Sequence, residues 1–410
     1  MTEAPEGSKT RILFVDDDAN ILAGLRRMFH AERDTWEMTF AEGPKEALPL
    51  VEKNGYDIVV SDMRMPDMDG AQLLAHVREL HPASVRLILS GNTSRAAALR
   101  AASIAHQFLS KPLEPEVLKQ AVLRASNIES HLPHETIRSV LGRHNSLPSP
   151  SSTLRLLNDE LGDANCDLGR VARIIEGDLA ITTKVLGLVN SAFFALPREV
   201  SNVKDAVVYL GIENVRALAA TADVFRALAG SDELNSLAAG LQVHSQGVLD
   251  IARAVHPLSE SRADLYLGAV LHDLGFLAIA ALLPDSWSAL RARHGNNWGL
   301  QDEKETVGAT HCEIGAYLLA LWGLPYGAVE IVAMHHDPLP IAGGCSTNVE
   351  AVRLAEAPCP RPTHRRGTTP SVRPPTSSRS ESTTNFRRGV ANVTSRYRLR
   401  PIYVRVARSA

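Results

Sequence analysis

Hydrophobic and polar positions in residues 10–127 follow two alternating periods. Short apolar runs predict five strands, at Arg11–Val15, Trp36–Ala41, Asp57–Ser61, Val85–Ser90 and His106–Ser110. Apolar residues at helical spacing predict five helices, at Ala19–Ala31, Pro44–Lys53, Gly70–Leu80, Ser94–Ala102 and Glu114–Ser126. Strands that alternate with helices are typical of an α/β fold. We therefore expect a doubly wound, five-stranded parallel sheet with helices on both faces.

Residues 131–340 carry a different pattern, in which helical periods replace the strand-like runs. This pattern predicts an all-α domain of roughly 200 residues. One of its helices is expected to begin after Asp167, a suitable N-cap, and to end at Gly177, a suitable C′ residue. The acidic segment Asp302-Glu303-Lys304-Glu305 is typical of a solvated helix face.

The composition changes again near the C-terminus. Residues 357–410 contain 12 Arg, no Lys and one acidic residue, a net charge of +11, among many Pro, Ser and Thr. Such a stretch buries too little apolar surface to fold alone, so we expect a disordered tail or a basic arm for nucleic acid or an acidic partner. The predicted divisions are a disordered N-terminus (1–9), the α/β domain (10–127), a linker helix (128–142), the helical domain (143–345) and a disordered Arg/Pro/Ser-rich tail (346–410).

The overall composition narrows the class of protein. Of the 410 residues, 45% are hydrophobic and 22% are charged, with a net charge of −3, which is typical of a soluble globular protein. No apolar run approaches the ~18 residues that span a bilayer, and residues 1–10 are unlike a signal peptide. We therefore expect a cytoplasmic protein without a membrane segment. The cysteines lack paired metal spacing and suit reduced thiols: Cys166, Cys312, Cys345 and Cys359.

Polar residues follow four of the predicted strands. Asp16 and Asp17 come after the first strand, Asp62 ends the third, Ser90 ends the fourth, and Lys111 follows the fifth. The carboxyl ends of parallel strands converge at one edge of a doubly wound sheet. The gathered carboxylates would repel each other without a cation, and hard oxygen ligands suit Mg²⁺. An aspartate beside Mg²⁺ can attack a phosphoryl group, while Lys111 and the Ser90 hydroxyl hold phosphoryl oxygens.

At these positions the chain resembles the receiver domain of bacterial two-component response regulators, over essentially all of residues 10–127. The resemblance implies a flavodoxin-like sheet and phosphorylation of Asp62 by a sensor histidine kinase. It also implies that Asp62 binds Mg²⁺, with Asp17 as a direct Mg²⁺ ligand, Asp16 as its acidic partner and the Arg64 main-chain carbonyl as a further ligand. Ser90 is then the switch hydroxyl, Phe108 the switch aromatic and Lys111 the family's lysine. The Lys111–Pro112 bond is expected to be cis.

Histidines recur through the helical domain together with one aspartate. They are His244, His272-Asp273, His311 and His335-His336. Imidazole and carboxylate ligands that helices bring together suit Zn²⁺, Mn²⁺ or Fe. A metal held in this way can activate water for attack on a phosphodiester.

This region resembles the HD superfamily of metal phosphohydrolases, and more closely its HDOD subfamily, over about residues 135–345. The resemblance implies a non-enzymatic signalling domain with a vestigial metal site. Phe276 stands where the hydrolytic HD-GYP branch has a lysine, and no Gly-Tyr-Pro follows His336, which disfavours hydrolysis of cyclic dinucleotides. The matching motifs are Ala180–Phe194, Leu196–Arg198, Ala206–Gly211, Trp322–Pro325 and His335–Pro338.

We therefore predict a response regulator that signals through a protein partner of its helical domain, with the signal passing through Ile128–Gly142. Its expected chemistry is limited to phosphorylation and dephosphorylation of Asp62, with Mg²⁺ as cofactor. The alternative is a phosphorylation-regulated phosphodiesterase that needs a transition metal in the histidine site. Direct DNA binding is not expected, because no helix-turn-helix segment follows the receiver-like region. Two interpretations of Asn190–Phe194, partner docking and core packing, stay open, as does the choice between monomer and dimer.

Overall fold

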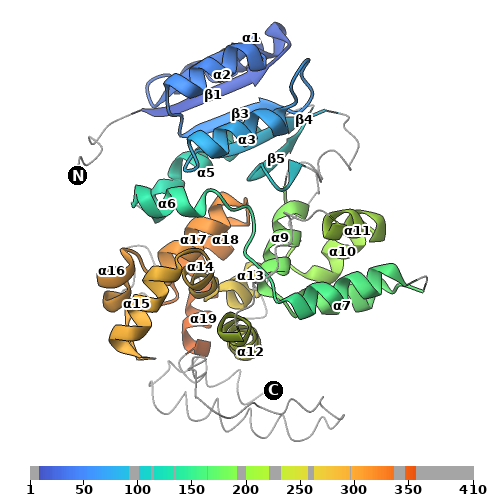
Figure 1. The fold of residues 1–410 in the computed structure, drawn as a ribbon, viewed down its shortest axis with the longest axis vertical. Helices are drawn as coiled ribbons and strands as arrows, with labels where there is room; N and C mark the ends of the chain where they lie inside the picture. Colours follow the sequence, from blue (N-terminus) through green and yellow to red (C-terminus); the bar gives the residue numbers. More distant parts are fainter. Residues whose placement is uncertain are drawn as a thin grey trace, which may run out of the picture.

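The chain has an α/β region at one end and a larger helical region beneath it (Figure 1). The structure is a computed structural model. It describes residues 9–91, 101–111, 115–132, 134–163, 165–191, 200–220, 232–256, 263–295, 297–336 and 347–356. Several predicted features lie largely or wholly outside these residues: the helix Ser94–Ala102, Pro112, Phe193-Phe194, Leu196–Arg198, Asp337-Pro338, Cys345, Cys359 and the basic tail.

Five parallel strands form one sheet in the order β2-β1-β3-β4-β5, which confirms the predicted fold. The central strand β3 is buried along its whole length, as expected for a strand covered on both faces. Its register pairs Val60 with Phe14 of β1 and Leu87 of β4. The strands are β1 Thr10–Asp16, β2 Trp36–Glu42, β3 Ile58–Asp62, β4 Val85–Ser90 and β5 Gln107–Ser110.

Helices flank this sheet at nearly the predicted positions. The first helix ends three residues earlier than expected and is followed by a 3₁₀ turn, His30–Glu32. The last continues five residues beyond its predicted end, because Ile128 and Leu132 extend the buried face that Leu118 begins. The helices are α1 Ala19–Met28, α2 Pro44–Lys53, α3 Gly70–Leu80 and α5 Pro115–His131.

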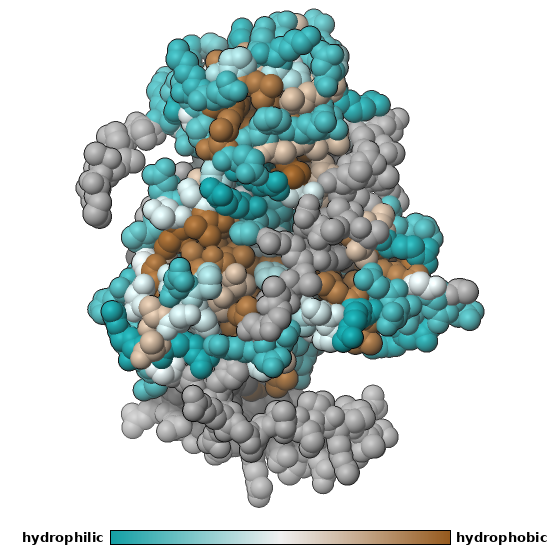
Figure 2. All heavy atoms as spheres, viewed as in Figure 1, coloured by the Kyte–Doolittle hydropathy of each residue, from teal (hydrophilic) through white to brown (hydrophobic). Residues whose placement is uncertain are grey.

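The rest of the described chain is helical, as the sequence predicts. Figure 2 shows hydrophobic residues gathered where α14 and α17 lie in Figure 1. The helices are α6 Glu135–Leu141, α7 Ser151–Gly162, α8 Leu168–Glu176, α9 Leu179–Val189, α10 Val203–Leu210, α11 Ile212–Ala220, α12 Asp232–Val255, α13 Ala263–Leu271, α14 Leu274–Leu282, α15 Pro284–His294, α16 Leu300–Val307, α17 His311–Leu321, α18 Tyr326–Met334 and α19 Thr347–Glu356.

Two local predictions need refinement. Residues 128–142 are not one helix, because the last turn of α5 and the separate helix α6 share them. Asp167 caps α8 as predicted, with its side chain accepting a hydrogen bond from the Arg170 N–H. Gly177 is the C-cap itself, with a φ of −75° and no left-handed backbone.

Membrane-spanning potential is limited among the described residues. No single helix there is long and apolar enough to cross a bilayer. The bent pair Asp264–Leu271 and Leu274–Leu282, with 41° between its two helices, has the required length and composition only when both are counted together.

Candidate functional site

Four strand ends bring polar side chains to the carboxyl edge of the sheet. Asp16 ends β1, Asp62 ends β3, Ser90 ends β4, and Lys111 directly follows β5. The register aligns Ser90 with Ser110 of β5, and Asp62 with the residue before Ser90. The structure therefore places these side chains at one level of the sheet.

Lys111 bridges two buried carboxylates at this edge. Its Nζ lies 2.6 Å from Asp16 Oδ2 and also donates a hydrogen bond to Asp62 Oδ1. Burial raises the pKa of Asp16, and Lys111 offsets part of that rise. Burial lowers the pKa of Lys111, but its bonds to Asp16 and Asp62 outweigh this and raise the pKa. The two acids and the lysine therefore form one coupled charged group.

Main-chain N–H groups fix the remaining carboxylate oxygens. The Arg64 N–H donates to Asp62 Oδ2 at 2.6 Å, and the Asp18 N–H donates to Asp16 Oδ1 at 3.0 Å. Asp18 also caps α1. The loops after β1 and β3 thus set the orientation of both acids.

The turn from β3 to α3 packs directly against Asp62. The Gly70 N–H donates to the Met63 carbonyl at 3.0 Å, and a Cβ on residue 70 would lie 2.1 Å from the Asp62 carbonyl oxygen. Only glycine allows so close an approach. Asp69 begins α3 with a capping box that it shares with Gln72.

The remaining residues predicted for this site differ in exposure. Asp17 and the Arg64 side chain are exposed, whereas Ser90 and Phe108 are buried. The Ser90 hydroxyl donates to the Gly91 carbonyl at 3.4 Å. Phe108 pairs in register with β4 two residues before Ser90.

A second group of polar side chains lies inside the helical region. His244 belongs to α12, His272 and Asp273 join α13 to α14, and His311 begins α17. His335 and His336 directly follow α18 and come to the same place. The structure thus gathers all five histidines that the sequence singled out. We call these residues, with Asp273, the histidine cluster.

Asp273 lies at the centre of the histidine cluster and is fully buried. The Nε2 atoms of His244 and His272 each lie 3.4 Å from its Oδ2. Those of His311 and His335 lie 3.4 and 3.6 Å from its Oδ1. Neither oxygen makes a hydrogen bond within the described residues. A buried carboxylate is costly unless charge or hydrogen bonds compensate it, so this arrangement favours a cation between the rings and the carboxylate.

The second nitrogen of three rings fixes their orientation. His272 Nδ1 and His335 Nδ1 each lie 2.8 Å from the backbone carbonyl three residues earlier. His311 Nδ1 lies 2.8 Å from Glu303 Oε2. These contacts aim the Nε2 atoms at Asp273. Such outer partners are typical of histidines that bind metals.

Glu303 corrects the prediction for the acidic segment. The sequence predicts a solvated face, yet Glu303 is fully buried and accepts hydrogen bonds from the His311 backbone N–H and ring at 2.8 Å. Lys304 and Glu305 are exposed as expected. One residue of the segment points inward because it lies on the buried face of α16, and the run of charges conceals that position.

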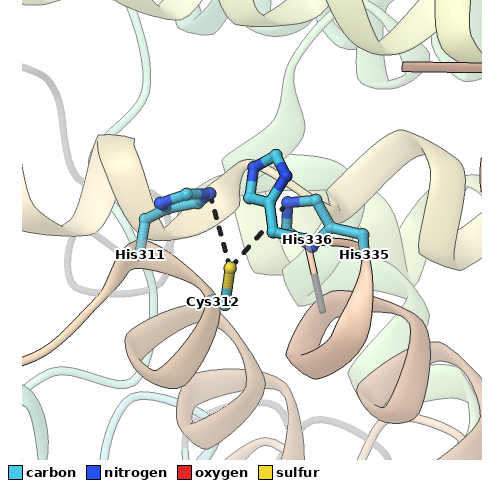
Figure 3. Close-up of side chains that lie close together, drawn as sticks. All are labelled: His311, Cys312, His335 and His336. Carbon is cyan, nitrogen blue, oxygen red and sulfur yellow. Dashed lines mark hydrogen bonds between the residues drawn. The ribbon is translucent and has the colours of Figure 1, made fainter. Parts of the chain in front are cut away.

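Cys312 is a member of this group that the sequence analysis missed. Figure 3 shows its sulfur beside the rings of His311 and His335, with Sγ–Nε2 distances of 3.5 and 4.0 Å. Burial raises the pKa of the thiol, but His311 and His335 outweigh this and lower the pKa to about 6. Burial lowers the pKa of His335, but Cys312 and Asp273 raise it to about 10. The only signal in the sequence is adjacency to His311.

Helix α14 closes one side of the histidine cluster. The Phe276 ring stacks on His311, with centroids 3.9 Å apart and planes 15° apart. A Cβ on Gly275 would lie 1.9 Å from the His311 carbonyl oxygen, so this glycine permits the close approach. Phe276 therefore presents an apolar face to the cluster at the position where the hydrolytic HD-GYP branch has a lysine.

Three groups of side chains in the described chain could hold a metal ion. One contains His244, His272 and Asp273. Another combines His311, Cys312, His335 and His336. The third combines Asp273, His335 and His336 with Glu356 of α19, whose Oε1 lies 3.3 Å from His336 Nε2. Glu356 was not predicted from the sequence.

Two family models match separate parts of the chain. The response regulator receiver domain matches residues 12–123, and the HDOD domain matches residues 147–338. The chain belongs to the response regulators. The sheet edge with Asp62 lies in the receiver domain, and the histidine cluster lies mainly in the HDOD domain.

Relatives of known sequence match one part or the other. A two-component response regulator of Arabidopsis thaliana is 40% identical over 123 residues, which cover 28% of this chain and 22% of that protein. An uncharacterized protein of Treponema pallidum is 25% identical over 203 residues, which cover 48% of this chain and 39% of that protein. The chain therefore spans well under two thirds of either relative.

Two solved structures are matched over most of their own length. The MmoQ response regulator from Methylococcus capsulatus is 21% identical, with a TM-score of 0.44, and the match covers 52% of this chain and 86% of that one. The signal receiver domain of an HD domain-containing protein from Pseudomonas fluorescens Pf-5 is 27% identical, with a TM-score of 0.29, and the match covers 30% of this chain and 98% of that one.

The receiver and HDOD domains of this response regulator are in direct contact. Gln107 of β5 donates hydrogen bonds from Nε2 to the carbonyls of Ala320 and Leu321 at 3.2 and 3.3 Å. These carbonyls lie at the end of α17 opposite to His311. Figure 1 shows β5 and α5 facing the helical region.

Lys184 of α9 joins the same interface. Its buried Nζ donates to the carbonyls of Ala102 at 2.7 Å and Asn145 at 2.9 Å. Burial lowers the pKa of Lys184 to about 7. Lys184 lines a small cavity together with Phe108 of the receiver domain and Trp322, which follows α17. Phe108 therefore faces the HDOD domain.

Arg86 of β4 attaches the segment after α6 to the sheet. It is fully buried, and its Nη2 donates to the Gly142 carbonyl at 2.8 Å and to Asn145 Oδ1 at 3.1 Å. Its Nε donates to the Ile104 carbonyl at 2.9 Å. Sequence reasoning assigned no role to Arg86 or to Gln107. The signal available was a single polar residue inside an apolar strand or helix.

Proposed function

We propose that the protein is a switch in which Asp62 accepts a phosphoryl group from a sensor histidine kinase. The observation that carries this proposal is the convergence of Asp16, Asp62 and Lys111, with the Lys111 Nζ bonded to both acids. The match to the receiver domain supports it. In the transfer, the N–P bond of phosphohistidine breaks and a bond forms between phosphorus and an Asp62 carboxylate oxygen. Residues 10–127 then form the switch, and residues 143–345 form the output domain.

The residues at this edge fit a Mg²⁺ ion. Asp16 and Asp62 present buried carboxylate oxygens from neighbouring strands, and Asp17 presents an exposed one. The Arg64 main-chain carbonyl belongs to the loop that follows Asp62. An all-oxygen set of donors is what Mg²⁺ prefers. When bound, the ion neutralises the charge that develops on the transferring phosphoryl group.

The remaining steps use the chain's own side chains. Lys111 already contacts Asp62 and is positioned to hold a phosphoryl oxygen. The Ser90 hydroxyl moves toward the phosphoryl group, and Phe108 follows it inward. Because Phe108 shares a cavity with Lys184 and Trp322, its movement changes the contact with the HDOD domain. This route is more direct than the path through residues 128–142 that the sequence suggested.

Substitution of Asp62 tests the switch. The Asp62→Asn variant should fold normally and take up no label from radioactive acetyl phosphate, because an amide cannot form the acyl phosphate. Asp67→Asn is the matched control, since Asp67 is an exposed acid of the same loop and pairs with the exposed Lys45. It should be labelled like the unmodified chain. Normal labelling of Asp62→Asn would refute the assignment.

The proposed output is a change in affinity of the HDOD domain for a protein partner. A ligand shifts such an equilibrium only through its different interactions with the two states. Pull-downs with the full chain, unmodified and treated with beryllium fluoride as a phosphoryl mimic, should recover a partner in one state only. Equal recovery in both states would argue against a phosphorylation-dependent output.

A second function, metal-dependent phosphodiester hydrolysis, has one observation in its favour. Asp273 is a fully buried carboxylate that has no hydrogen bond within the described residues and lies among four ring nitrogens, which fits a transition metal. When bound, such a metal activates water. The apolar Phe276 against His311 argues for metal binding without turnover. Elemental analysis of the purified chain and assays with cyclic dinucleotides and Mn²⁺ separate these possibilities; turnover that Asp273→Asn abolishes would establish hydrolysis.

A further inference from the structure

We propose that Cys312 is a metal ligand, and that His311, Cys312, His335 and His336 together take a cation with affinity for sulfur, Zn²⁺ in the first place. The ligand set implied by the HD resemblance contains only imidazoles and carboxylate. A thiolate ligand therefore gives this site a different metal preference. The proposal rests on the metal binding considered above for the histidine cluster.

The separations between donor atoms support this assignment. Zn²⁺ binds sulfur at ~2.3 Å and imidazole nitrogen at ~2.0–2.1 Å, so tetrahedral neighbours lie about 3.3–3.6 Å apart. The Cys312 Sγ lies 3.5 Å from His311 Nε2 and 4.0 Å from His335 Nε2. The donor atoms of all four residues lie within 4.8 Å of one another. Small side-chain movements suffice to close this shell around an ion.

The surroundings give a second, independent indication of a cation. The two Asp273 oxygens are fully buried and without hydrogen bonds within the described residues. The Nε2 atoms of His311 and His335 are 3.4 and 3.6 Å from Oδ1, which is longer than an ordinary N–H···O hydrogen bond. The same two nitrogens also lie 3.5 and 4.0 Å from the Cys312 Sγ. Each is therefore near both a carboxylate and a sulfur atom, which are the kinds of donor that share a metal ion with imidazole.

Orientation of the rings favours coordination over a simple thiol–imidazole contact. His311 and His335 both use Nδ1 for a contact of 2.8 Å, with Glu303 and with a backbone carbonyl, which leaves Nε2 for an ion. Figure 3 shows the Cys312 sulfur between these two rings, with His336 beside them. As the Sγ–metal bond forms, the thiol proton passes to solvent. Thiolate ligands select Zn²⁺ over the harder Mn²⁺ and Mg²⁺.

Cobalt substitution tests the proposal on the full chain. Co²⁺ bound to a thiolate has a near-ultraviolet charge-transfer band, whereas Co²⁺ bound only to nitrogen and oxygen lacks it. We expect the band in the unmodified chain and its loss in Cys312→Ser. Zn²⁺ affinity should fall about tenfold or more in that variant, since even the outer partners of metal ligands contribute 10–100-fold. Cys166→Ser is the matched control, because this free cysteine lies outside the cluster.

A second variant keeps the test decisive if Cys312→Ser does not fold. The triple variant Cys166→Ser, Cys345→Ser, Cys359→Ser leaves Cys312 as the sole cysteine of the chain. It should bind Co²⁺ with the full band. Cobalt binding without the band would overturn the sulfur ligand while leaving metal binding by the histidine cluster intact. Failure of both Co²⁺ and Zn²⁺ to bind, by elemental analysis, would overturn both.

Discussion

Two glycines of this protein differ in how closely other atoms pack around them. Gly70 packs against the end of β3, where a Cβ would lie 2.1 Å from the Asp62 carbonyl oxygen. A Cβ added to Gly24, inside α1, would have open space around it. Packing rather than residue type therefore predicts the effect of adding a methyl group.

We predict that Gly70→Ala lowers the free energy of unfolding by about 1–3 kcal/mol, because the turn after β3 must shift. Gly24→Ala should raise it by up to about 1 kcal/mol, because alanine favours the helix. Urea denaturation of both variants measures the difference. Equal stabilities would mean that the β3–α3 turn relaxes without cost.

The free energy of unfolding should depend on pH through the side chain of Lys184. Burial lowers its pKa from 10.5 to about 7, so between these values the unfolded chain binds more protons than the folded one. The stability contributed by Lys184 is therefore fully present above pH 10.5 and is lost as the pH falls toward 7. Relative to Lys184→Met, the unmodified chain should gain up to about 1.4 kcal/mol per pH unit in this window. Urea denaturation at pH 7, 8 and 9 checks this; a constant difference would contradict it.

At the scale of elements, α17 links the histidine cluster to the receiver domain. Its first residues, His311 and Cys312, belong to a group that could hold a metal ion, and the carbonyls of its last turn accept hydrogen bonds from Gln107 of the receiver domain. A helix of this length spans about 16 Å. A helix moves as a rigid unit, so a displacement of one end of α17 also displaces its other end.

Removing the Gln107 contact should weaken the domain interface. Gln107→Ala loses two hydrogen bonds and should lower the free energy of unfolding by about 1–2 kcal/mol. Gln120→Ala is the control, because Gln120 is an exposed residue of α5 whose side chain bonds to Glu116 of the same helix. Its effect should stay within about 0.5 kcal/mol. Similar losses in thermal or urea unfolding for both variants would show that the Gln107 contact contributes no stability.

Most of the elements could be predicted because their burial follows their sequence period. The strands agree within one residue at each end, since each is a short apolar run bounded by polar residues. The end of α5 was wrong by five residues, because Ile128 and Leu132 pack on the rest of the core beyond the predicted boundary. The burial of Glu303 was also predicted wrongly, because its hydrogen-bond partner His311 lies in another helix.

At the scale of the whole molecule, the domain interface could not be predicted from the sequence. Gln107 contacts a carbonyl 213 residues away, and Lys184 contacts one 82 residues away. Because these hydrogen bonds go to backbone carbonyls, no pair of complementary side chains in the sequence indicates them. The Asp62 site was easier to predict, because parallel topology brings strand ends together whatever the loops between them contain.

The position of α17 between the two domains has a thermodynamic consequence. If an ion at His311 and a phosphoryl group on Asp62 both favour particular placements of this helix, then each must alter the affinity for the other by the same factor. Couplings of this kind are typically ~5–150-fold. Titration of beryllium fluoride with and without Zn²⁺, and of Zn²⁺ with and without beryllium fluoride, should give equal ratios of dissociation constants. The response regulator would then sense metal supply through the same equilibrium that its kinase controls, and ratios of one would show that the two sites are independent.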